Sequence, residues 1–521
     1  MHGCLHRTLR ILAGFLVLAA AAASARAADV TKANNTDDLN LASSWVGGSA
    51  PGSGDTIVWD STVTAANIVL LGADLDVQGV RIANPGGNVT INAGNTLTLG
   101  SAGIDMSAST RNLNIQAPVK LSAAQVWNAS NRLLDTNGNK NFSGINVDNQ
   151  GHTLTVQAAE NTNGGVDLGN VTGGGGIIKN GAGWLRMHGN AYDFTGDVVL
   201  NEGIFVAFDV NSLGSGGSAL TLAGGRLVLT RGLNVDYGRN TTVSGDAEIF
   251  NTRPGGGGAQ NYTLGTLSIG ANTLTVNRIS NGPTAGSIIF GDTTLTGNST
   301  FNVGDHGTDP AALNQLRLGA VGESGGSRDL LKSGGGTLIL SGASSYTGTT
   351  TISDGILALA AGGSLDGSSA ITVASDAVFD ISAINSGLTI ATDQLLAGAG
   401  SILGSLSFGS DSKLAFSSSL TIDSGTVNFD GFGIDDITGL DGTVVSEGSY
   451  SLLGGDASFD LTGAANVGAA NAADIGGGRL AYFDGAGLQV IVVPEPTGLL
   501  LLGGGGICGG LALLGRRLRT S

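Results

Sequence analysis

The amino-acid sequence predicts an all-β protein whose short strands stack into a solenoid between residues 28 and 493. Apolar and polar residues alternate in short runs such as Leu97–Leu99, Leu154–Val156 and Leu274–Val276, and a period of two indicates a strand with one buried face. Gly, Asn and Asp between the runs favour turns, and 89 of the 521 residues are glycine. Two segments repeat each other, and such a unit buries its apolar face only by stacking on a neighbour.

The first 27 residues predict a secretory signal peptide, a short helix that is removed on export. Arg7 and Arg10 precede the apolar run Ile11–Ala23. Ala25 and Ala27 supply the small residues of a cleavage site, and cleavage is expected after Ala27. The alternative, an uncleaved N-terminal anchor, is disfavoured by the short apolar run.

The body between the two chain ends is acidic and lacks cysteine. The chain has 24 Lys and Arg against 41 Asp and Glu, a net charge of −17, and several arginines lie in the end segments. Such a surface repels nucleic acid and anionic lipid, so no nucleic-acid partner is expected. Cys4 and Cys508 both lie in the end segments, so the body has no disulfide framework and no thiolate metal site.

The segment from about residue 37 to about residue 60 is predicted to close the N-terminal end of the solenoid. It contains Trp45 and Trp59 among Gly and Pro residues. A terminal unit has to shield the core and the strand edge that stacking leaves open. An alternative role for the two tryptophans is stacking against sugars on an exposed surface.

Two copies of one pattern occur, at residues 177–222 and 330–373. Each copy has a Lys, two glycines and a Leu, then an aromatic-Thr-Gly triplet, then a further glycine before an apolar residue. The pattern predicts a strand, a turn and a second strand, in which the Lys and Gly residues have a structural role. These residues are Lys179, Gly181, Gly183, Gly196 and Gly203 in the first copy, and Lys332, Gly334, Gly336, Gly348 and Gly355 in the second.

This pattern resembles the autotransporter-associated β-strand repeat. The resemblance implies a right-handed parallel β-helix on an exported surface protein. The first copy departs from the pattern at Arg186 and His188, where small or aliphatic residues are usual. Weaker strand pairing is therefore expected around these two residues.

A distinct end segment is expected at about residues 430–493. Its aspartates Asp430, Asp435, Asp436 and Asp441 offer the oxygen atoms that Ca²⁺ binds. Neither of the familiar Ca²⁺-loop patterns surrounds them, so solvated aspartates in turns are the favoured interpretation. The sequence predicts no metal site and no cofactor.

No enzymatic activity and no catalytic residue are predicted. His152, His188 and His306 lie far apart in the sequence, and no metalloprotease, phosphate-loop or dinucleotide motif occurs. Two alternatives stay open. One is a surface carbohydrate-active enzyme, a lyase or hydrolase with a carboxylate pair among its aspartates, and the other is a lectin-like binding module.

Residues 494–521 predict a membrane-sorting segment. A Pro-Glu-Pro triplet is followed by Thr497–Gly515, a run of 19 uncharged residues that is long enough for a transmembrane helix, and then by arginines that match a cytoplasmic flank. This three-part end resembles the PEP-CTERM sorting signal of Gram-negative bacteria, with an ordinary single-pass anchor as the alternative. The residues that carry the resemblance are Pro494, Glu495, Pro496, Arg516 and Arg517.

The resemblance implies recognition by an exosortase, a membrane protease or transpeptidase. We therefore expect an exported structural or adhesin-like protein that passes through the inner membrane of a Gram-negative-type bacterium. It would then reach the cell envelope, the outer surface or the extracellular matrix, where exopolysaccharide is a further expected partner.

Overall fold

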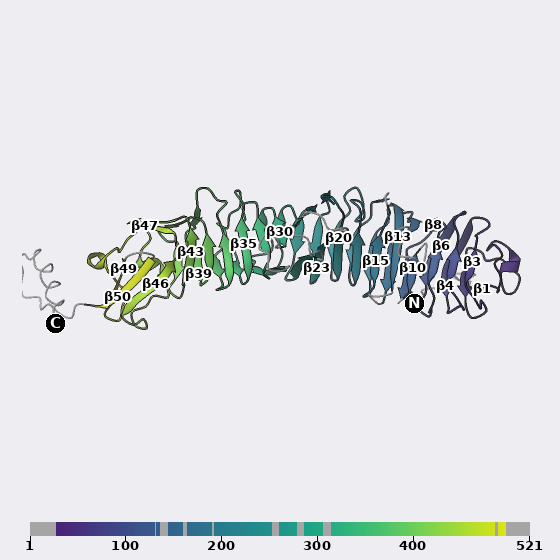
Figure 1. Cartoon of the computed structure of the whole chain (residues 1–521), viewed down its shortest axis with the longest axis horizontal. Helices are drawn as coiled ribbons and strands as arrows, with labels where there is room; N and C mark the ends of the chain where they lie inside the picture. The colour runs from purple at the N-terminus through teal and green to yellow at the C-terminus, as the bar shows by residue number, and fades with distance from the viewer. Residues whose placement is uncertain are drawn as a thin grey trace, which may run out of the picture.

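The protein is a long rod along which short strands follow one another from the N-terminal to the C-terminal end (Figure 1). The computed structural model describes residues 28–130, 132–135, 144–159, 164–189, 192–252, 260–278, 286–305, 314–484 and 488–495. The rod is a parallel β-solenoid of the right-handed type with about 16 turns. The predicted all-β solenoid is thus confirmed.

Each turn contributes strands to three faces, and strands of one face pair in parallel from turn to turn. Face 1 consists of β1 (Asp29–Thr31), β2 (Thr56–Trp59), β4 (Leu75–Ile82), β6 (Leu97–Asp105), β9 (Gln125–Ser130), β12 (Leu154–Ala158), β14 (Ile177–Asn180), β17 (Val198–Leu200), β19 (Leu220–Leu222), β22 (Thr241–Val243), β25 (Leu267–Ile269), β28 (Thr293–Leu295) and β31 (Val321–Glu323). In later turns a separate sheet follows, made of β38 (Leu388–Ile390), β41 (Leu406–Gly409), β44 (Thr426–Asp430) and β47 (Ser458–Gly463).

The second face is the longest ladder. Face 2 consists of β3 (Asn67–Val69), β5 (Val89–Ile91), β7 (Leu113–Ile115), β10 (Leu133–Asp135), β13 (Gly165–Gly173), β15 (Trp184–Met187), β18 (Ile204–Ala207), β20 (Arg226–Thr230), β23 (Ala247–Thr252), β26 (Thr273–Arg278), β29 (Ser299–Val303), β32 (Leu330–Ser333), β34 (Thr349–Ile352), β36 (Ala370–Val373), β39 (Leu395–Gly398), β42 (Lys413–Ala415) and β45 (Ile437–Thr438).

The third face uses the first halves of β4 and β6 and the end of β13. Its other strands are β8 (Val119–Leu121), β11 (Ile145–Asp148), β16 (Asp193–Phe194), β21 (Val235–Asp236), β24 (Tyr262–Thr263), β27 (Ser287–Ile289), β30 (Gln315–Leu318), β33 (Thr337–Leu340), β35 (Gly355–Leu359), β37 (Ala377–Asp380), β40 (Ser401–Leu403) and β43 (Leu420–Ser424).

The core is a set of rows that run along the rod axis, because inward-facing positions of successive turns stack directly on one another. On face 1, for example, the register aligns Val156, Lys179, Leu200 and Leu222, all of them buried. Each strand sends alternate side chains into these rows, which accounts for the period of two in the sequence. Lys179 thus lies between the aliphatic residues Val156 and Leu200 of neighbouring turns.

The N-terminal end is covered by a segment that folds back along β1 and contains the short helix η1 (Ala42–Ser44). Trp45 bridges antiparallel to Lys32, so the outer edge of the first strand is paired. Trp45 and Trp59 are 2% and 0% exposed, and their rings meet edge to face with centroids 6.3 Å apart. Neither ring is available to stack on a sugar.

The C-terminal end changes from parallel to antiparallel pairing. The strands there are β46 (Gly448–Gly454), β48 (Ala473–Asp474), β49 (Arg479–Asp484) and β50 (Leu488–Pro494), with η3 (Ile434–Asp436) and η4 (Ala469–Asn471) nearby in sequence. β50 lies between β46 and β49 and runs antiparallel to both. We call β46, β48, β49 and β50 the C-terminal cap.

The two predicted helices, the signal helix of residues 1–27 and the membrane helix of residues 497–515, lie outside the described residues. Within the part of the chain that the structure describes, no helix is long and apolar enough to cross a bilayer.

Candidate functional site

The lysine of each sequence repeat is buried in the core and donates hydrogen bonds to backbone carbonyl groups. The Lys179 Nζ donates to the carbonyl oxygens of Asn180 at 2.8 Å and Gly181 at 2.6 Å, in its own turn. A third bond, of 3.2 Å, reaches the carbonyl oxygen of Glu202 in the next turn. An ammonium group has three protons to donate, so this corner satisfies the buried charge and joins two turns.

The second copy repeats this arrangement. The Lys332 Nζ donates to the carbonyl oxygens of Ser333 at 3.0 Å, Gly334 at 2.5 Å and Asp354 at 3.0 Å. Burial lowers the pKa of Lys332 to about 8, with the nearby Asp354 charge opposing the shift. Burial likewise lowers the pKa of Lys179 to about 8, opposed by Glu202.

The two copies occupy different faces of the solenoid. Lys179 lies on β14 of face 1 and its turn leads to β15 of face 2. Lys332 lies on β32 of face 2, in line with Phe301 and Ile352, and its turn leads to β33 of face 3. The repeat therefore forms the same local corner between faces 1 and 2 and between faces 2 and 3.

Glycine is required at the conserved-spacing positions of the two repeats for two separate physical reasons. Gly203 and Gly355 adopt φ of +74° and +64°, and a β-carbon at either position would collide with carbonyl oxygens of the preceding turn. Gly196 and Gly348 lack positive φ, but there the backbone of the preceding turn approaches too closely for a side chain. Gly181 and Gly334, with φ of +74° and +73°, form the tight bend after each lysine. Gly183 is buried within this bend in the first copy, and Gly336 packs against the preceding turn of the solenoid in the second.

The sorting residues fall mostly beyond the described part of the chain. Pro494 ends β50, and the Glu495 N–H donates to the carbonyl oxygen of Gly478 at 2.8 Å. Both residues are exposed at the C-terminal cap. Pro496, Arg516 and Arg517, and the cleavage-site residues Ala25 and Ala27, lie outside the described residues.

The expectation of weak strand pairing at Arg186 and His188 is wrong. β15 keeps an unbroken register with both β13 and β18. The Arg186 guanidinium binds both carboxylate oxygens of Asp167, at 2.6 and 2.7 Å, and lies 3.7 Å over the ring of Trp184. On the outer face of a strand an arginine is normally surrounded by water. Here the contacts with Asp167 and Trp184 take the place of part of that water.

His188 completes this cluster. Its ring stacks on Phe208 with centroids 4.2 Å apart, and its Nε2 lies 3.5 Å from the Asp167 carboxylate. Burial, and then the charge of Arg186, lower the pKa of His188 to about 4. The imidazole is therefore neutral at physiological pH and packs as an aromatic ring.

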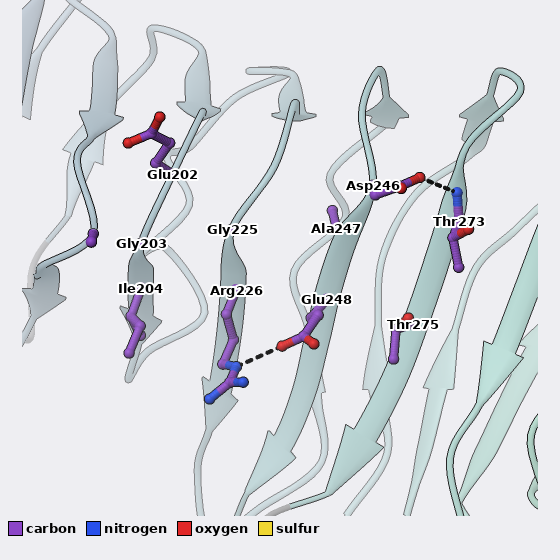
Figure 2. A pocket seen from close by; sticks show the side chains of 11 residues that line it. Glu202, Gly203, Ile204, Gly225, Arg226, Asp246, Ala247, Glu248, Thr273 and Thr275 are labelled. Atoms are coloured by element: carbon purple, nitrogen blue, oxygen red, sulfur yellow. Dashed lines mark hydrogen bonds and ion pairs between the residues drawn. The ribbon is translucent and has the colours of Figure 1, made fainter.

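An open groove of about 670 Å³ lies over β18, β20, β23 and β26 (Figure 2). Sequence reasoning did not identify it, because its residues come from separate turns and share no motif. Its lining combines small residues with carboxylates, one arginine and threonines: Ala182, Glu202, Gly203, Ile204, Gly225, Arg226, Asp246, Ala247, Glu248, Thr273 and Thr275.

Two carboxylates of the groove and two of the end segment have hydrogen-bond or ion-pair partners. Glu248 pairs with Arg226 at 2.8 Å, and Asp246 accepts the Thr273 N–H at 2.7 Å. Asp436 of the end segment pairs with Lys413 at 2.8 Å, and hydrogen bonds from Thr443 lower the pKa of Asp441. The described residues contain no group of His, Cys, Asp and Glu side chains that could hold a metal ion.

The comparisons with known proteins agree with the sequence repeats. Residues 177–207 and 330–359 match the model of the passenger-associated-transport-repeat, so the predicted autotransporter-associated repeat is confirmed. The chain is 39% identical over 112 residues to the adhesin BmaC autotransporter of Brucella suis biovar 1 (strain 1330). That match covers 21% of this chain and 3% of the adhesin. No solved structure matches the chain significantly.

Proposed function

We propose that this chain is an exported, non-enzymatic protein of the cell surface or extracellular matrix, with a structural or adhesin-like role. The observation that carries the proposal is the pair of passenger-associated-transport repeats built into a long β-solenoid. The similarity to part of an autotransporter adhesin supports the same role. A rod of stacked turns projects a large lateral surface for its chain length, which suits contact with polymers and neighbouring cells.

We further propose that an exosortase at the inner membrane sorts the chain through its C-terminal segment. Pro494 is the last residue of β50 and Glu495 follows it, and both are exposed at the C-terminal cap, so the triplet begins at the edge of the folded body. In this proposal the triplet is the recognition site, the apolar run holds it at the membrane, and Arg516 and Arg517 fix the register.

Glu495→Ala should leave the protein unprocessed in the inner membrane, because the variant lacks the only charge of the recognition triplet. The measurement is cell fractionation and immunoblotting of the variant in the native bacterium. Glu447→Ala, which removes an exposed carboxylate near the cap, is the matched control and should be released normally. Normal release of Glu495→Ala would refute the sorting proposal and leave the surface role to be tested by location alone.

A surface carbohydrate-active enzyme is the second candidate, because the groove brings together Glu202, Asp246 and Glu248. Pairing of Glu248 with Arg226 and the hydrogen bond to Asp246 favour binding over acid–base chemistry, which needs a carboxyl group free to exchange a proton. Release of reducing or unsaturated ends from a polysaccharide by the purified protein would favour the enzyme.

A further inference from the structure

The floor of the groove is made of small residues at corresponding positions of consecutive turns. Gly203, Gly225 and Ala247 immediately precede the aligned residues Ile204, Arg226 and Glu248. This row stands at the corner between faces 1 and 2 and lines the groove. The groove therefore runs along the rod axis, across several turns.

One wall follows the outer side of face 2. Figure 2 shows Ile204, Arg226, Glu248 and Thr275 side by side on four neighbouring strands, in the register that the pairing gives. Neighbouring strands are spaced by about 4.8 Å, so this row extends over about 14 Å. That length suits several units of an extended polymer.

The two charged groups of this wall pair with each other. The Arg226 guanidinium lies 4.0 Å over the ring of Phe250 while its Nε donates to Glu248. On the other wall, Asp246 is held by the Thr273 N–H, and Glu202 is exposed. The groove thus presents one charged donor, the Arg226 guanidinium, beside three carboxylate acceptors, with the apolar side chain of Ile204 at one end of the row.

This lining selects the charge of the ligand. Three carboxylates against one guanidinium, on a chain of net charge −17, repel anionic polymers. The positive charge of the Arg226 guanidinium, in the middle of the row, repels a cationic group of a ligand at that position. Uncharged hydroxyl groups of a ligand fit this lining, because each of them both donates and accepts hydrogen bonds. They can donate to the carboxylates, accept from the guanidinium, and do either with the threonine hydroxyl groups.

We propose that this groove binds a neutral polysaccharide that lies along the rod axis over β18, β20, β23 and β26. The proposal rests on the surface role proposed above and names the ligand class of that role. Carboxylates and Arg226 would bind the sugar hydroxyls, and Ile204 would contact the apolar face of a sugar ring.

The test is affinity electrophoresis of the purified protein in gels that contain dextran, xylan, galactomannan or hydroxyethyl cellulose. Thr275→Leu removes a hydroxyl group and adds bulk to the groove without an aromatic ring, and Glu202→Ala, which truncates an exposed acceptor and should also weaken binding, serves in case the first variant misfolds. Thr372→Leu makes the same change at a half-buried position of β36, also on face 2 but far from the groove, and is the matched control. Circular dichroism checks that all variants fold.

We expect at least one neutral polymer to retard the native protein and Thr372→Leu alike, and Thr275→Leu to bind at least about tenfold more weakly. Retardation by none of the neutral polymers, or equal retardation of Thr275→Leu and the native protein, would overturn the proposal. Binding to alginate or poly-lysine alone would assign the groove to a charged polymer instead. The protein's location in the cell is measured separately, so failure of the groove proposal is distinguishable from failure of the surface role.

Discussion

A lysine that faces the core of a solenoid needs an acceptor for each ammonium proton, and the repeat corner supplies three backbone carbonyl oxygens. The geometry is the same at Lys179 and Lys332, although the two stand on different faces. At each corner one of these carbonyl groups belongs to the following turn, at Glu202 and Asp354 respectively. Each buried lysine therefore links two successive turns through its hydrogen bonds, and we call this contact a clamp.

Lys332→Met should destabilise the protein by about 2 kcal/mol, because it leaves buried carbonyl groups without a donor. The measurement is urea-induced unfolding followed by circular dichroism. Lys120→Met, at an exposed lysine on β8, is the control and should change stability little. Equal stability of the two variants would show that the lysine does not act as a clamp.

The lowered pKa of Lys332 also predicts a pH dependence. The folded-state pKa is about 8, against 10.5 for an ordinary lysine. Between these values the unfolded chain carries a proton that the folded protein does not, so the free energy of unfolding contributed by this group rises with pH. The increase in the free energy of unfolding from about pH 8 to about pH 10 should therefore be smaller in Lys332→Met than in the native protein. Identical slopes would contradict the buried charge.

At the scale of the element, side chains outside the core add contacts between the paired strands β13, β15 and β18. Arg186 is exposed for 20% of its side chain and Asp167 for 8%, so their bidentate pair is largely shielded from water. Packing of Arg186 on Trp184 and of His188 on Phe208 extends this cover along the outer face. An arginine outside the repeat pattern thus supports the sheet that it was expected to weaken.

Arg186→Met alone should destabilise the protein by about 2 kcal/mol, because the largely shielded carboxylate of Asp167 would lose the guanidinium that binds both its oxygens. Adding Asp167→Leu should recover part of that loss, since the shielded charge is then removed. Urea unfolding of the two single variants and the double variant measures the coupling. Additive effects of the two substitutions would indicate that the pair contributes nothing to stability.

Alternation in the sequence was sufficient to predict the strands, and the two repeated segments predicted their stacking. The inward position of Lys179 is consistent with its spacing of two from Ile177. The Arg186–Asp167 pair joins residues 19 apart, and the groove joins residues from several turns. Which residues meet across turns depends on the length of every loop between them. That information is not carried by a local pattern, so the pair and the groove were not predicted.

At the scale of the whole molecule, a solenoid has two open ends, and both are closed here. The N-terminal segment pairs with β1 and buries two tryptophans, and the C-terminal cap ends the parallel ladder with antiparallel strands. Closed ends prevent strand-by-strand association of neighbouring rods. The excess of negative charge favours solubility, and the body between the two end segments contains no cysteine that could form a disulfide.

The most direct test of the proposed export and sorting is the intact mass and location of the protein made by its native bacterium. We expect a mass that lacks the first 27 residues and the apolar C-terminal segment, in protein recovered from the cell surface or the surrounding matrix. A mass that retains the C-terminal segment, in protein confined to the inner membrane, would contradict the proposed sorting and surface role.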